Sequence, residues 1–132
     1  MFAQNPVPYH MFRRVNPEWY ETLARYCPND DLLRVVRPLL PDTWNIHRGI
    51  VWFHASPVDS TYVTQGWKIH VSATPSNCAE IAHYTTTVCV EHQVAFKFAV
   101  DRHMVFLMTS KGWDRPGSGK FITIYPSTDQ QF

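Results

Sequence analysis

Two segments of the chain alternate between apolar and polar residues with a period of two, which predicts β-strands with one buried face. Residues 67–72, with the sequence WKIHVS, put three apolar side chains on one face and Lys68 and His70 on the other. Residues 94–100, VAFKFAV, put the larger apolar side chains on one face, and Lys97 stands between two alanines on the other. Both predicted strands therefore carry basic groups on the face opposite the expected core.

The other strand signals are less regular. Residues 44–53 have strand-like apolar spacing that is interrupted at residues 47–49, and the polar segment 56–65 after them is predicted as a loop or an edge strand. Residues 121–125, FITIY, form an apolar run that Pro126 closes, which predicts a core strand.

Helix signals separate these strands. Asn16, Pro17 and Glu18 predict the start of a helix over residues 17–26, and Asp30 is expected to cap a second short helix that ends near Pro38. After a turn, a third helix of about 15 residues is predicted from its periodic apolar face. That face is expected to contain Ile81, Tyr84 or Thr85, Val88 and His92.

Composition narrows the possible functions. The chain has 132 residues, of which 45% are hydrophobic and 17% charged, and its formal net charge is +1. This composition suits one folded domain, and the small net charge excludes binding to nucleic acid or an anionic membrane through the charge of the domain as a whole.

Targeting signals and a disulfide framework are not indicated. No stretch has the length and apolarity of a transmembrane helix or the core of a signal peptide, so we expect a cytoplasmic protein. Three cysteines without a CxxC pair indicate neither a disulfide framework nor a thiolate zinc site.

Lys97 is the residue that an ordinary strand explains least well. Lysine is depleted from strands and is rarely buried without a partner. In a central strand, burial and cationic neighbours would lower the pKa of the amine, and a lysine that is neutral near physiological pH can act as a base. The alternative is an edge-strand lysine that blocks aggregation between sheets. The pattern alone leaves both interpretations open.

Other basic residues are candidates for an anion site. His70, on the same face as Lys68, is either a structural or a functional histidine. The seven histidines show no compact metal-ligand spacing, so no metal site is predicted. Residues 117–120, GSGK, lack the first glycine and the Ser or Thr of a phosphate loop, so this segment is not predicted to be a nucleotide-binding motif.

The basic loop can still be an anion site. Arg115 and Lys120 either bind an anion or are solvated. Several cations without a carboxylate suit a phosphorylated substrate.

The chain also contains three blocks of distinctive sequence. They are residues 66–75, GWKIHVSATP; residues 96–98, FKF; and a block in which Arg115 precedes residues 118–126, SGKFITIYP. Their order and spacing closely resemble the N-terminal lyase domain of class III lanthipeptide synthetases, which is similar to bacterial effector phosphothreonine lyases. The resemblance implies an α+β fold, a single domain with a mainly antiparallel sheet and flanking helices, and β-elimination without a cofactor.

The resemblance further implies roles for six residues. Those that match catalytic positions are Lys97, His70 and Tyr125, and those that match phosphate-binding positions are Lys68, Arg115 and, less closely, Lys120. Lys97 would be the general base that removes the α-proton of phosphoserine or phosphothreonine, and His70 the general acid that protonates the departing phosphate. Tyr125 would orient the base or stabilise enolate charge. The products would be dehydroalanine or dehydrobutyrine and inorganic phosphate.

Members of this family continue into further phosphate-binding arginines, a kinase domain and a cyclase domain. We therefore expect residues 1–132 to be a phosphoserine/phosphothreonine lyase domain, incomplete at its C-terminus, of a longer synthetase. The implied partners are a phosphorylated precursor peptide and the kinase and cyclase domains, with no nucleic acid and no membrane. The alternative is a non-catalytic module that holds a phosphopeptide or leader peptide for a neighbouring kinase.

Overall fold

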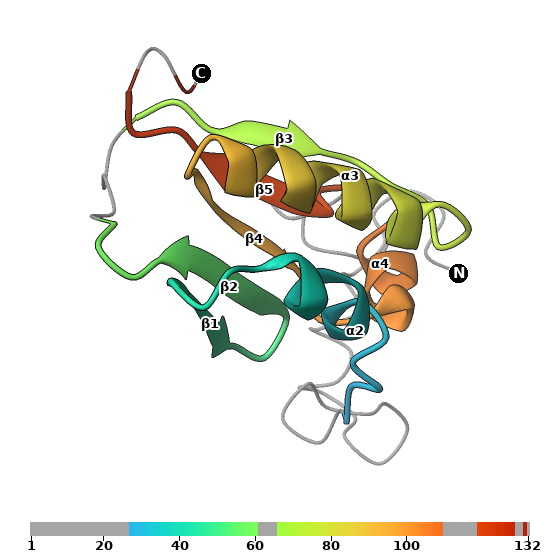
Figure 1. Ribbon diagram of the computed structural model, residues 1–132. Helices are drawn as coiled ribbons and strands as arrows, with labels where there is room; N and C mark the ends of the chain where they lie inside the picture. Colours follow the sequence, from blue (N-terminus) through green and yellow to red (C-terminus); the bar gives the residue numbers. More distant parts are fainter. Residues whose placement is uncertain (1–26, 61–65, 110–118, 129–130, 132) are drawn as a thin grey trace, which may run out of the picture.

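The computed structural model describes residues 27–60, 66–109, 119–128 and 131 (Figure 1). Its strands form one antiparallel sheet in the order β1-β2-β4-β5-β3. They are β1 (Trp44–Arg48), β2 (Trp52–Pro57), β3 (Ile69–Val71), β4 (Ala95–Ala99) and β5 (Ile122–Tyr125). The helices are α2 (Leu33–Val36), the 3-10 helix η2 (Arg37–Leu39), α3 (Cys78–Glu91) and α4 (Arg102–Met108). This arrangement confirms the predicted α+β class and antiparallel sheet.

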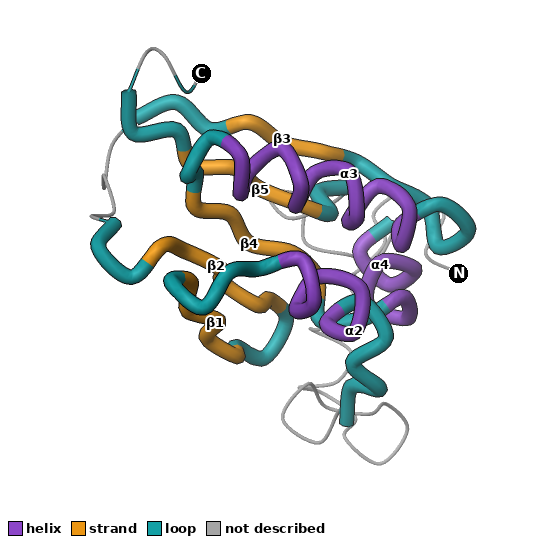
Figure 2. Tube along the Cα trace, in the orientation of Figure 1, coloured by secondary structure: helices purple, strands orange, loops and turns teal. Residues whose placement is uncertain are grey.

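The helices lie on one face of the sheet, and the core is formed between the two layers (Figure 2). Its largest fully buried side chains include Phe53, Phe96, Phe98, Phe121, Leu32, Met104 and Met108. Among the residues that the structure describes, no helix has the length and apolarity needed to cross a membrane. The described helices cover the apolar face of the sheet, and the opposite face carries polar side chains such as Lys97 and Thr123.

β4 is the middle strand of the sheet, with β2 on one side and β5 on the other. Phe96 and Phe98 are fully buried on the helix-covered face, as their alternation predicts, and Lys97 is half-buried on the opposite face. The interpretation of Lys97 as an edge-strand residue is therefore wrong. β3, which carries His70, is an edge strand and is shorter than the alternation predicts.

The interruption in residues 44–53 is the turn of a β-hairpin. β1 ends at Arg48, and the Gly49 amide donates a hydrogen bond of 2.8 Å to the carbonyl oxygen of Trp52, where β2 begins. A Cβ atom at Gly49 would lie 2.9 Å from the same oxygen, so the turn requires glycine. The prediction of a loop or edge strand from Ser56 is wrong at its start, because β2 continues to Pro57 and lies between β1 and β4.

α3 forms where the periodicity predicts a helix, but it buries a different face. Of the residues expected on the core face, Ile81 packs against the core and is partly buried, but Val88 is 53% exposed. Of the two alternatives, Tyr84 is 64% exposed and Thr85 is partly buried. The buried residues of the helix are Cys78, Ala82, Thr86 and Cys89. These side chains are smaller, so they allow the helix axis to come closer to α2 and β4 than a stripe that contains tyrosine would. Both helix faces contain apolar residues, and close packing therefore determines which of them is buried.

The predicted second helix exists as α2 and η2, but Asp30 does not cap it. The residue before α2 is Leu32, and no side chain caps this end. Asp30 instead has a φ of 58° and forms an ion pair of 2.6 Å with Arg48 at the end of β1. Its carboxylate thus ties the start of the described chain to the β1–β2 hairpin. The helix predicted over residues 17–26 lies outside the described residues.

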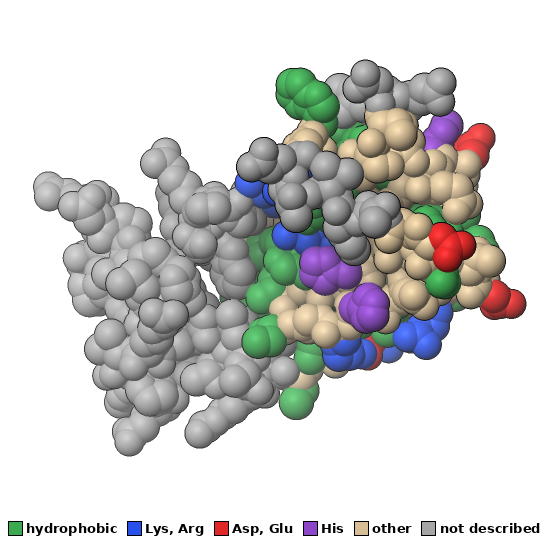
Figure 3. Space-filling view, turned by 90° about the vertical axis from the view of Figure 1, so that its left-hand side faces the viewer, with side chains coloured by type: hydrophobic (Ala, Val, Ile, Leu, Met, Phe, Trp, Pro, Cys, Tyr) green, Lys and Arg blue, Asp and Glu red, His purple; other side chains and the backbone are tan. Residues whose placement is uncertain are grey.

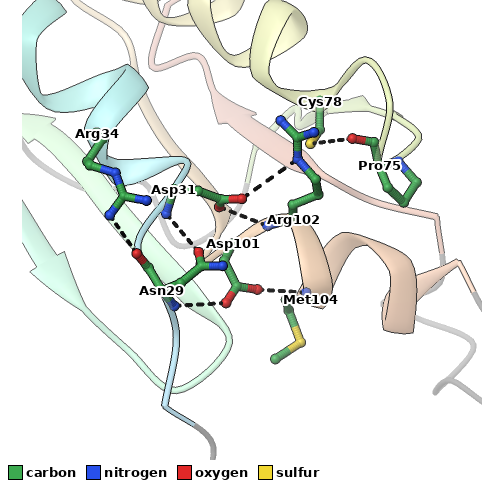
Figure 4. Close-up of polar contacts among 8 residues, drawn as sticks. All are labelled: Asn29, Asp31, Arg34, Pro75, Cys78, Asp101, Arg102 and Met104. Atoms are coloured by element: carbon green, nitrogen blue, oxygen red, sulfur yellow. Dashed lines mark hydrogen bonds and ion pairs between the residues drawn. The ribbon is translucent and has the colours of Figure 1, made fainter.

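A buried carboxylate joins the segment before α2 to the start of α4 (Figure 4). Asp101 is 1% exposed and caps α4 by accepting a hydrogen bond of 2.7 Å from the Met104 amide. Its second oxygen accepts from the Asn29 amide at 3.3 Å. Asp31 completes the junction by accepting from the Arg102 amide at 3.0 Å. These bonds join segments that are about seventy positions apart in the sequence.

Candidate functional site

A row of polar side chains crosses the sheet on the face opposite the helices. Its members, in strand order, are His47, His54, Lys97, Thr123 and His70, each paired in register with the next. Paired residues of an antiparallel sheet present their side chains on the same face, so all five strands contribute to one row. The space-filling view shows histidine side chains next to each other and beside lysine or arginine side chains (Figure 3).

Part of this row lies in a pocket of about 330 Å³. The lining residues are Trp52, Lys68, His70, Lys97, Lys120, Thr123 and Tyr125. Three of them are lysines and none is acidic, so the pocket concentrates positive charge in a molecule whose net charge is only +1. A concave site of this kind attracts anions, and phosphate above all, because its charge and oxygens match several cationic donors.

Lys97 is half-buried in the pocket, whereas Lys68 is exposed. Its Nζ atom lies 4.4 Å from the centroid of the Trp52 ring. Burial lowers the pKa of the Lys97 amine, and the positive charges of Lys68 and Lys120 lower it further. Both effects disfavour the ammonium form, so this amine loses its proton more readily than an exposed lysine does. That is the property required of a lysine that acts as a general base.

His70 lies across β5 from Lys97. Its Nδ1 atom is 3.3 Å from the hydroxyl oxygen of Thr123, the residue of β5 that pairs with both Lys97 and His70. Burial lowers the pKa of the imidazole, followed by the charges of Lys120, Lys68 and Lys97. Without an anion in the pocket, His70 therefore favours its neutral form. A bound dianion would reverse the electrostatic part of this effect and favour the imidazolium.

Lys68 and Lys120 are placed by the ends of β3 and β5. Lys68 is one residue before β3, and its Nζ atom lies 5.9 Å from the centroid of the Tyr125 ring. Lys120 follows Gly119, whose φ of 74° is a left-handed conformation that glycine adopts without strain. The Gly119 amide donates to the carbonyl oxygen of Met108, which fixes the approach of this segment to β5.

The structure brings together five of the six residues that the sequence resemblance singled out. Lys97, His70, Tyr125, Lys68 and Lys120 all line the pocket. Arg115, the sixth, lies outside the described residues. The placement gives these side chains a common site, and their individual roles remain predictions.

Two residues that line the pocket, Thr123 and Trp52, were not predicted as site residues from the sequence. Thr123 is buried and lies two positions before Tyr125 on the same strand, so the period of two that placed the other strand residues was sufficient to find it. Trp52 gave no such signal, because the hairpin that carries it was predicted as one interrupted strand. No three His, Cys, Asp or Glu residues within the described ranges group closely enough to hold a metal ion.

The chain is similar to a known family and to a curated protein. A family model described as "RamC, N-terminal domain" matches residues 32–132, which include every strand and each lining residue of the pocket. A protein of Streptomyces coelicolor named "Probable SapB synthase" is 38% identical over 93 residues. The matched region is 70% of this chain and 10% of that relative, so the chain spans about a tenth of the relative's length.

Proposed function

The chain belongs to the RamC N-terminal domain family, and we propose that it is a lyase that eliminates phosphate from phosphoserine or phosphothreonine in a peptide. The family assignment confirms the resemblance to the N-terminal domain of class III lanthipeptide synthetases. We place the reaction in lanthipeptide biosynthesis, with a ribosomal precursor peptide as the substrate and dehydroalanine or dehydrobutyrine as the product.

One observation carries this proposal. A half-buried lysine and a histidine face the same pocket from opposite sides of Thr123, in a lining that contains two further lysines and no carboxylate. In the proposed reaction, the neutral amine of Lys97 takes the proton from Cα of the phosphorylated residue. The electron pair of that C–H bond forms the Cα–Cβ double bond, and the Cβ–O bond breaks. The leaving oxygen takes its proton from the imidazolium of His70.

The charges of the pocket suit both proton transfers once phosphate is bound. Lys68 and Lys120 neutralise the dianion, and we assign Arg115 to the same role from the sequence resemblance. The dianion in turn favours the protonated form of His70, whose pKa the surrounding lysines lower while the pocket is empty. Tyr125 lines the same pocket, with its ring 5.9 Å from the Lys68 Nζ atom, and we assign it, from the sequence resemblance, the role of orienting the base or stabilising enolate charge. The scheme requires no cofactor.

We also propose that the domain works within a larger cytoplasmic synthetase. In that arrangement a kinase domain supplies the phosphorylated peptide and a cyclase domain uses the dehydrated product. The chemistry demands this order, because elimination consumes a phosphate ester and leaves an alkene that a thiol can attack. A module that only holds the phosphopeptide is the competing function, and it needs the cationic pocket but not the base.

The deciding experiment uses the complete synthetase and follows its precursor peptide by mass spectrometry. With Lys97→Ala or His70→Ala, we expect phosphorylated peptide to accumulate without dehydration. His83→Ala, an exposed histidine on α3, is the matched control and should dehydrate the peptide normally. Normal dehydration by both pocket variants would contradict the lyase. Tight phosphopeptide binding by the chain, with no phosphate released by the intact synthetase, would favour the binding module.

A further inference from the structure

Trp52 contacts Lys97 from the neighbouring strand. On β2, Trp52 pairs in register with Ala99 of β4, so Lys97 is its diagonal neighbour two residues along that strand and on the same face. Ala99 has only a methyl side chain, which leaves the indole free to reach across β4. The ring centroid lies 4.4 Å from the Lys97 Nζ atom, within the range of a cation–π contact.

The groups around Lys97 act on its charge in opposite directions. Those that face it from the surrounding segments are His54 of β2, Thr123 and Tyr125 of β5, His70 of β3, and Lys68 and Lys120 beside these strands. None of the pocket-lining residues is acidic. Burial and the two lysines disfavour the ammonium form of Lys97. The face of the Trp52 indole favours it, because the ring quadrupole attracts a cation.

We propose that Trp52 is a positioning residue for the base, whose indole holds the Lys97 amine in the pocket and stabilises the ammonium that forms when the amine takes the proton. This inference rests on the proposed function, which makes Lys97 the base. The contact offsets part of the effect of burial and charge repulsion. Lys97 thereby keeps enough basicity to remove a proton from carbon while it remains easier to deprotonate than an exposed lysine.

The first test measures the titration of Lys97 directly. The chain has four lysines, so ¹³C labelling of lysine gives few signals, and the one that Lys97→Arg removes belongs to Lys97. Trp52→Leu keeps an apolar side chain over the amine but removes the π face. We expect the pKa of Lys97 to fall by about half a unit, the size of an exposed cation–π contact. Trp52→Phe should give a smaller fall.

Controls separate this contact from a general structural change. Phe106→Leu replaces an exposed ring on α4, away from the pocket lining, and should leave the pKa of Lys97 unchanged. An unchanged or raised pKa in Trp52→Leu, with circular dichroism like that of the wild type, overturns the proposal, since loss of cover alone would raise it. If Trp52→Leu does not fold, the smaller fall expected for Trp52→Phe decides the question.

A second readout in the complete synthetase distinguishes this inference from the proposed function. We expect Trp52→Leu to slow dehydration and to move the acid limb of its pH–rate profile to lower pH. If the pKa of Lys97 falls as expected while Lys97→Ala dehydrates normally, the lyase function fails and the contact stands. If Lys97→Ala abolishes dehydration but Trp52→Leu leaves the pKa of Lys97 unchanged, the role of Trp52 alone is overturned.

Discussion

The two faces of the central strand β4 are formed by alternate residues of one short segment, and they differ in chemistry: one buries aromatic rings and the other carries a lysine. On the covered face, Phe96 and Phe98 are fully buried, and Phe98 stacks against Phe53 with ring centroids 5.4 Å apart. On the opposite face, which carries the polar row and is called the polar face below, Lys97 lies between them in sequence yet is half-buried among other cations. Burial of the aromatic rings lowers the free energy of the folded state relative to the unfolded state, whereas desolvation of the lysine charge raises it.

This difference shows how a small domain can tolerate a destabilising site. The polar face belongs to the same strands whose other face packs the core, so apolar burial directly beneath the cationic pocket offsets its destabilising effect. The pocket residues also come from strands that are far apart in sequence, and the register of the sheet brings them together. Changes on the two faces should therefore differ in both sign and size.

The largest expected effect is on the covered face. Phe98→Ala removes a fully buried ring from the contact with Phe53 and leaves a cavity beneath the central strand. We expect it to lower the free energy of unfolding by about 3–5 kcal/mol, measured by urea denaturation of the chain. Phe106→Ala, at an exposed ring, should cost far less. Equal losses for the two variants would contradict the assignment of Phe98 to the core.

The same contrast explains which parts of the fold could be predicted from sequence. Alternation placed Lys97 and His70 on strands and on the face opposite the core, because a period of two follows directly from strand geometry. The apolar run that Pro126 closes placed Tyr125 on a strand. The order of the strands could not be predicted, since pairing depends on contacts that are distant in sequence. For that reason the central position of Lys97 and its neighbour Trp52 emerged only from the structure.

The prediction of which face of α3 is buried was wrong for a related reason. Helical periodicity identifies stripes of apolar residues, but α3 has more than one such stripe, and Tyr84 is large enough to look like a core residue. The side chains that are actually buried, such as Ala82 and Thr86, are small. Which stripe packs is decided by how closely the helix and its partners can approach, and a single sequence does not contain that distance.

A smaller effect of the opposite sign is expected on the polar face. Lys97→Met keeps the length of the side chain but removes a charge that burial and two lysines disfavour. We expect the free energy of unfolding at neutral pH to rise by up to about 1 kcal/mol, even though the proposed lyase activity is lost. Thermal or urea unfolding of the chain measures the change. A destabilisation comparable to that of Phe98→Ala would remove the distinction between the two faces.

The pH dependence of this gain checks its cause. Because the pKa of Lys97 is lower in the folded protein than in the unfolded chain, the unfolded chain binds more protons between the two values. The contribution of Lys97 to wild-type stability should therefore become less unfavourable as pH rises through that window, and the advantage of Lys97→Met should shrink there. An advantage that stays constant up to strongly alkaline pH would assign the gain to packing and not to the charge.

The smallest expected effect compares the two halves of the polar row. His70 lines the cationic pocket, whereas His54, its matched control, does not. Burial is the main cause that lowers the pKa of each, and nearby lysine charge adds to it. Inorganic phosphate bound in the pocket should raise the pKa of His70, since the dianion favours the imidazolium, and should move that of His54 less.

Proton NMR of the histidine rings, with and without phosphate, measures both values in one sample. The signals are assigned by His70→Gln and His54→Gln. Lys68→Met together with Lys120→Met should reduce the response of His70 to phosphate, because the two lysines supply most of the charge that holds the anion in the described pocket. Equal shifts of His70 and His54 would mean that phosphate acts on the whole polar face. A shift confined to His70 would place the anion beside the proposed acid, where elimination needs it.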